Sequence, residues 1–177
     1  MSIGLFRGTV SVEPYSKEWE TTAQQTIGQL KNILRASAVD IQHIGSTSIV
    51  SICAKPIIDI VIGVNDFNEI LALNDKLEEK GFLFRGQDHP EQYLYVCGRD
   101  NFITHHIHVV LYDSDYWNDY VNMRDYLNSH SDDAKAYSEL KMSLAEKYAE
   151  DRITYTNMKG DFIGEILAKA RKWRIGK

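Results

Sequence analysis

Hydrophobic positions repeat along the N-terminal half of the chain with two different periods. Residues 17–35 carry apolar side chains at helical spacing, and Ser16 in front of them is a residue type that caps helices. Residues 39–44 predict a short strand. Pro56 precedes the run IIDIVIGV at 57–64, which predicts a strand buried on both faces because it is continuously apolar and rich in β-branched residues.

The middle of the chain combines one helical pattern with two short strand patterns. Asn65 or Asp66 is expected to cap a helix that ends at Gly81, where glycine accepts a left-handed conformation at little cost. Residues 82–85 and 93–96 predict two strands. They flank the polar loop GQDHPEQ, so we expect a hairpin.

The last third begins with a strand and continues as helices. The segment THHIHVVL, residues 104–111, alternates in a way that predicts a strand. Ser114, Ser131 or Asp132, and Thr154 are the expected caps of three helices. The whole order predicts an α+β fold, with a small mixed sheet, helices packed on one side of it and a C-terminal helical segment.

Composition and charge narrow the class of protein. The 177 residues fit one domain, 1–177, and a net charge of −5 with a pI near 5.7 provides no general basic face. We therefore expect no nucleic-acid partner. Cys53 and Cys97 are too few for a disulfide scaffold and are expected to be free and buried. No apolar run reaches the roughly 18 residues of a membrane span, so a cytoplasmic protein without membrane contact is expected.

One turn concentrates hydrogen-bond donors. The segment HIGSTS places His43, Gly45, Ser46, Thr47 and Ser48 directly after a strand. Exposed backbone N–H groups and hydroxyls in such a turn can cradle a phosphate. The alternative is that glycine and serine occupy this turn for steric reasons alone.

Asp59 and two histidines are the candidates for chemistry. An acid in the middle of an apolar strand needs a cation or hydrogen-bond donors, and a structural salt bridge to Lys55 is the alternative to a metal. Lys55 is also a candidate for ligand binding. His106 and His108 share one strand face, at a spacing that suits a divalent metal or a phosphate oxygen. Asp59 completes this set if the two strands are neighbours; otherwise the histidines occupy a polar sheet face.

The remaining aromatic and basic residues receive no catalytic part. Aromatic side chains in YLYV, SDYWNDYV and RDYL have strand or helix spacing and are expected in the core. Arg124 and Lys141 lie on late helices, from which they could reach a phosphate. Solvated surface charges are the preferred interpretation of both.

The motifs HIGSTS...AKPIIDIVIGV, THHIHVV, RDYLNSH and YSELKMSLAEKY resemble the GrpB family across nearly the whole chain. That family is similar in fold to the nucleotidyltransferases and is also found fused to dephospho-CoA kinase. The resemblance implies that Gly45–Ser46 and Asp59 correspond to the turn and the first acid of a two-metal site. Val61 stands where the second acid is expected, and His106 or His108 where the third is expected.

Two functions follow from this resemblance. The first is transfer of a nucleotidyl or phosphoryl group to an unidentified acceptor, with Ser46 on phosphate, Asp59 on metal and the histidines as metal ligands or proton carriers. The second is a catalytically inactive module that binds a nucleotide, a phosphate or a metal. A divalent metal is expected in either case, Mg²⁺ or Mn²⁺ by preference, or Zn²⁺ if the histidines are ligands.

Overall fold

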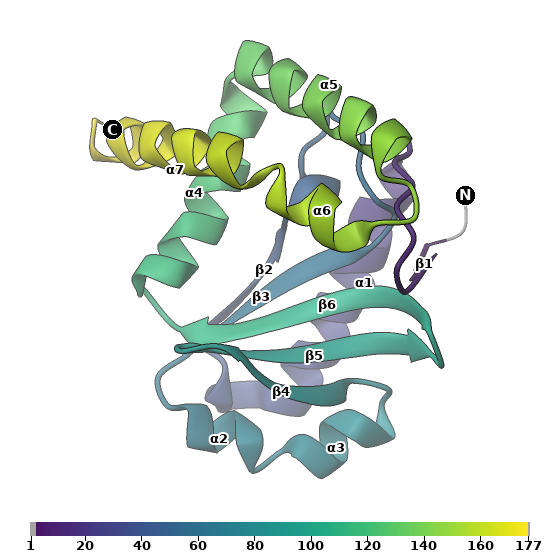
Figure 1. The fold of residues 1–177 in the computed structure, drawn as a ribbon. Helices are drawn as coiled ribbons and strands as arrows, with labels where there is room; N and C mark the ends of the chain where they lie inside the picture. The colour runs from purple at the N-terminus through teal and green to yellow at the C-terminus, as the bar shows by residue number, and fades with distance from the viewer. Residues whose placement is uncertain (1–2, 177) are drawn as a thin grey trace.

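The computed structural model describes residues 3–176, in which helices and strands follow one another in a mixed order (Figure 1). The strands are β1 (Leu5–Phe6), β2 (Asp40–Ile44), β3 (Ile58–Val64), β4 (Leu83–His89), β5 (Gln92–Arg99) and β6 (Phe102–Leu111). The helices are α1 (Lys17–Leu34), η1 (Arg35–Ser37), η2 (Ser46–Ser48), α2 (Phe67–Leu71), α3 (Asn74–Glu79), α4 (Asp115–Ser129), α5 (Ser131–Lys147), α6 (Arg152–Asn157) and α7 (Gly160–Ile175).

The strands form one mixed sheet. Its order is β2-β3-β6-β5-β4, and β1 pairs with β6 outside this path. β3 and β6 run parallel, whereas the other pairs are antiparallel, so the predicted mixed sheet is confirmed. The register of β3 and β6 places Asp59 beside His106 and Val61 beside His108. The two strands are therefore the neighbours that a shared site requires.

Helices cover both faces of the sheet, which corrects the expectation of helices on one side. The side chains of Ile58, Ile60, Ile62 and Val64 join a core with residues of α1, α2 and α3. Val61 packs on the opposite face with residues of β2, β6 and α4. Figure 1 shows α1 behind the strands, apart from the grouped helices α4 to α7. The apolar run of β3 explains the arrangement, because a strand that is apolar on both faces needs a cover on each.

Several predicted boundaries were wrong. The helix expected up to Gly81 is two short helices, α2 and α3, of which Asp66 caps the first. The expected hairpin loop lies mostly inside β4 and β5. Asp151 rather than Thr154 caps α6, and α5 begins at Ser131 after His130, which makes no side-chain cap. The tail thus contains four helices, because the chain turns again between α6 and α7.

Two expectations drawn from composition, on membrane spans and on the cysteines, can be compared with the structure. No helix within residues 3–176 combines the length and apolar character that a membrane span requires. Cys53 and Cys97 are both free, but only Cys53 is fully buried. Burial raises the pKa of the Cys97 thiol to about 12, so this thiol is protonated at neutral pH.

Candidate functional site

The turn after β2 lies close against Asp59, and only the lack of a side chain at Gly45 leaves room for this approach. Gly45 has φ +69° and ψ −171°, a conformation that favours glycine. A Cβ atom at this position would lie 2.5 Å from Asp59 Oδ2 and 2.8 Å from Asp59 Cβ. The Ser48 hydroxyl closes the turn by donating to the Gly45 carbonyl at 2.6 Å. The glycine therefore allows the turn and the carboxylate to share one site.

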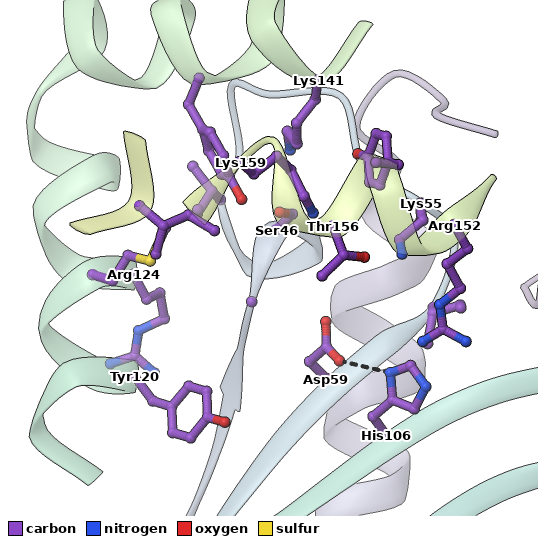
Figure 2. A pocket seen from close by; sticks show the side chains of 17 residues that line it. Ser46, Lys55, Asp59, His106, Tyr120, Arg124, Lys141, Arg152, Thr156 and Lys159 are labelled. Atoms are coloured by element: carbon purple, nitrogen blue, oxygen red, sulfur yellow. Dashed lines mark hydrogen bonds and ion pairs between the residues drawn. The ribbon is translucent and has the colours of Figure 1, made fainter. Parts of the chain in front are cut away.

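A cavity of about 340 Å³ opens beside this turn. Of the residues predicted from the sequence, five line it: Gly45, Ser46, Lys55, Asp59 and His106. Figure 2 shows Ser46 and Asp59 on one side of the space and side chains from the C-terminal helices facing them. The sheet supplies the floor, and α4, α5, α6 and the start of α7 supply the walls.

The other predicted residues support the site without lining the cavity. His43 Nε2 lies 2.9 Å from the Thr47 hydroxyl, and both side chains are buried. Burial lowers the pKa of His43 to about 4, so this imidazole is neutral. His108 contacts the ring of Tyr120 at a centroid distance of 5.1 Å. Together with Ser48, these residues fix the turn and the neighbouring strand.

Asp59 pairs with histidines rather than with Lys55. Its Oδ1 atom lies 3.2 Å from His106 Nδ1 and 3.7 Å from His108 Nε2. Burial alone would raise the pKa of Asp59, but the hydrogen bond from His106 and the attraction of both histidines outweigh it and hold this pKa well below its usual range. An ionised carboxylate only accepts, so His106 donates from Nδ1 and its Nε2 carries the lone pair when the ring is neutral.

Four cationic side chains surround the space opposite Asp59: Lys55, Lys141, Arg152 and Lys159. They come from the loop before β3, from α5, from α6 and from the residue before α7. We call these four residues the cation cluster. Within residues 3–176, none of the four forms an ion pair with a carboxylate. The cluster therefore has an unbalanced positive charge that the sequence, with its net charge of −5, did not suggest.

Tyrosine rings and backbone oxygen stabilise the lysines of this cluster. Lys55 Nζ and Lys159 Nζ lie 5.2 and 4.3 Å from the centroid of the Tyr155 ring. Lys141 Nζ lies 4.5 Å from the Tyr137 ring and donates to the Cys53 carbonyl.

The pKa values of Lys55, Lys141 and Lys159 are all lowered in the folded protein. Burial is the largest cause, and repulsion from neighbouring cations adds to it. The pKa of Lys141 falls to about 7, and those of Lys55 and Lys159 fall to about 8. An anion in the cavity would relieve this repulsion.

Two basic residues that were expected on the surface belong to the site. Lys141 is 2% exposed and lines the cavity. Arg124 also lines the cavity and donates to the Gln42 side chain at 2.8 Å and to the His43 carbonyl at 3.0 Å. The position of Lys141 could have been inferred, because it follows Tyr137 by four residues and therefore lies on the same inward helical face.

Other lining residues were missed altogether. Arg152, Thr156 and Lys159 were not singled out, and no motif marks them. Tyr120, an aromatic residue expected only in the core, also reaches the cavity, as do Tyr137 and Tyr155. Tyr137 and Tyr155 are buried as well as lining the cavity.

Among residues 3–176, Asp59 has no second carboxylate beside it with which to form a two-metal centre. Val61 is fully buried in an apolar cluster with Ile44, Val110 and Trp117, so its position faces packed side chains. No group of three or more His, Cys, Asp or Glu side chains in residues 3–176 is arranged to hold a metal ion. The residues present do not fit two-metal chemistry.

Comparisons with known proteins agree on the fold and on the family. The family described as GrpB protein matches residues 9–169. Glutamate-rich protein GrpB of Alkalihalophilus pseudofirmus is 39% identical over 170 residues, covering 93% of this chain and 98% of that protein. The crystal structure of GrpB from Enterococcus faecalis is 28% identical with a TM-score of 0.87, covering 93% of this chain and 99% of that one.

A more distant similarity identifies the fold. The Cid1 poly(U) polymerase, solved with MgGTP bound, has a TM-score of 0.52 at 12% identity and covers 76% of this chain and 44% of that one. At this identity the similarity concerns the fold alone, which is that of the nucleotidyltransferases. The match over residues 9–169 and the 39% identity establish the relationship at the sequence level: this chain belongs to the GrpB family.

Proposed function

We propose that the chain binds a nucleotide or another phosphorylated small molecule in the cavity beside Ser46. One observation carries this proposal: the cation cluster faces a donor-rich turn across a cavity of about 340 Å³, with no carboxylate partner among residues 3–176. Buried like charges destabilise a fold unless an anion compensates them. Phosphate groups are suitable anions, because Lys and Arg bind them by charge-assisted hydrogen bonds.

The side chains that line the cavity indicate which type of ligand fits it. The hydroxyl of Ser46 and the backbone N–H groups of its turn can donate hydrogen bonds to phosphate oxygens. Apolar and aromatic side chains such as Ile49, Met123 and Tyr120 line the same space and can contact an uncharged part of the ligand. A ligand with a phosphate end and a less polar end, such as a nucleotide, fits both sets.

Binding without two-metal transfer is the preferred form of this function. Two-metal transfer needs carboxylates that bridge the ions, and the position next to Asp59 on the same strand face is the buried Val61. A protein with the nucleotidyltransferase fold and this substitution can retain the ligand pocket while losing the metal chemistry.

Transfer of a nucleotidyl or phosphoryl group is the second candidate, and the pair of Asp59 and His106 favours it. His106 lines the cavity, and its Nδ1 proton is held by Asp59, which leaves Nε2 as a base. Incubation with radiolabelled nucleoside triphosphates and cell extract tests this candidate. Label on an acceptor that is lost in His106→Gln would favour transfer over binding alone.

A thermal-shift experiment tests the binding proposal. ATP, ADP and pyrophosphate are added at high concentration to the wild-type protein, to Arg152→Gln in the cavity and to Arg85→Gln, an exposed residue of β4. A ligand at 100 times its Kd adds about 2.7 kcal/mol of stability. This raises the Tm by roughly 5–10 °C for a chain of this size. We expect the shift in wild type and Arg85→Gln and a smaller one in Arg152→Gln; no shift with any phosphate would refute the proposal.

A further inference from the structure

The cation cluster contains more positive charge than one phosphate group requires. Lys55, Lys141, Lys159 and Arg152 all line the cavity, and Asp59 is the carboxylate that faces them. A single phosphate carries a charge of about −1.5 to −2 at neutral pH, which leaves part of this cluster uncompensated. Linked phosphates bring several negative charges into one small volume.

The cluster approaches the cavity from several sides. Its members come from four separate segments of the chain, with Lys55 and Lys159 both at the Tyr155 ring and Lys141 over the Tyr137 ring. A cavity of about 340 Å³ is within the range of small-molecule sites. Several cationic groups therefore meet in one small volume, where they can contact more than one phosphate group of a single ligand.

In this cavity, lysine and arginine side chains supply the positive charge that metal ions supply in a two-metal site. Asp59 Oδ1 already accepts a hydrogen bond from His106 and lies 3.7 Å from His108 Nε2, and Val61 offers no second carboxylate. The lysine and arginine side chains can instead contact the phosphate oxygens directly. Such a site does not depend on a divalent ion arriving with the ligand.

We infer that the cavity is a metal-independent polyphosphate site, which binds two or more linked phosphates, as in a nucleoside di- or triphosphate, through Lys55, Lys141, Arg152 and Lys159. This inference rests on the proposed phosphate binding and specifies its ligand class. The Ser46 turn and the cation cluster hold the phosphate chain, and the apolar walls contact the rest of the ligand.

Titration calorimetry with tripolyphosphate, pyrophosphate and orthophosphate tests the inference, first in a chelator and then with Mg²⁺. In the chelator, we expect tripolyphosphate to bind at least about tenfold more tightly than orthophosphate, because each added charge-assisted contact contributes about that factor. Mg²⁺ should weaken this binding, since it neutralises the charges that the cluster recognises.

Variants connect the result to the cluster. Lys159→Gln is expected to weaken tripolyphosphate binding by about tenfold. Lys147→Gln should leave it unchanged, because Lys147 contacts a tyrosine ring in the same way but is exposed and outside the cavity. Thermal unfolding of both variants confirms that they are folded.

The other possible outcomes would contradict either the polyphosphate inference or the proposed function. Equal affinity for orthophosphate, binding that requires Mg²⁺, or equal effects of the two variants would overturn the polyphosphate inference and leave the proposed phosphate binding intact. No binding of any phosphate compound would remove the proposed function itself.

Discussion

Replacing Lys141 by methionine removes one buried charge while nearly preserving the shape of the side chain. Lys141 is 2% exposed, lies over the Tyr137 ring and donates to the Cys53 carbonyl. Burial lowers its pKa from 10.5 to about 7, and Lys159 and Lys55 add to this effect against the opposing influence of Cys53. The stability of the ligand-free protein should therefore depend on pH through this residue.

The sign and size of the effect follow from proton linkage. Above pH 7 the unfolded chain keeps the Lys141 proton that the folded protein has released, so the free energy of unfolding rises with pH. This added stability disappears as the pH falls toward 7. Each pH unit contributes at most about 1.4 kcal/mol, or roughly 3 kcal/mol between pH 7 and pH 9. Lys141→Met lacks this contribution. Loss of the hydrogen bond to Cys53 adds a pH-independent cost of about 1 kcal/mol.

Urea unfolding at pH 7, 8 and 9 in phosphate-free buffer measures this effect. The stability of wild type minus that of Lys141→Met should increase toward pH 9 by about 2–3 kcal/mol. Lys147→Met, on the exposed side of the same helix, is the matched control and should show a constant difference. A constant difference for Lys141→Met as well, or one that increases toward pH 7, would refute the account of a destabilising buried charge.

The remaining predictions concern the turn and the ligand. Gly45→Ala should lower the free energy of unfolding by more than about 2 kcal/mol, because it combines backbone strain with a clash against Asp59. Gly8→Ala also carries backbone strain, at φ +92°, but meets open space and should therefore cost less. Equal losses in urea unfolding would contradict the geometry. Binding of pyrophosphate should take up protons between pH 7 and pH 9, because the anion raises the pKa values of Lys55 and Lys159 from about 8. The affinity for pyrophosphate should therefore fall as pH rises. Calorimetry in buffers of different ionisation enthalpy measures the proton uptake, and equal binding enthalpies in all buffers would contradict it.

Local patterns in the sequence predicted the floor of the site. The apolar run of β3 and the alternation of β6 indicated their strands, and the polar residues within them marked Asp59, His106 and His108. The sequence left open whether these strands are neighbours. The parallel pairing that joins Asp59 to His106 is a property of the sheet order, which depends on long-range contacts.

Apart from the inward helical face that contains Lys141, the walls of the site could not be predicted in the same way. Helical periodicity shows which residues of a helix share a face, but it does not show which part of the sheet that face covers. Arg152 and Lys159 line the cavity opposite Asp59 only because the chain turns between α5 and α7 and places α6 over the cavity. A lysine such as Lys141 is interpreted as a surface residue by its usual preference, and only the packing of α5 against the turn overrides that preference.

Nuclear magnetic resonance of the ¹⁵N-labelled protein, titrated with pyrophosphate in the presence of a chelator, tests the central claim most directly. The account predicts that the backbone amide signals of Gly45, Ser46 and Thr156 shift together and saturate at one ligand per chain, while those of the exposed α1 surface stay in place. Amide signals that do not move, or shifts confined to residues outside the cavity, would contradict a phosphate site between the Ser46 turn and the cation cluster.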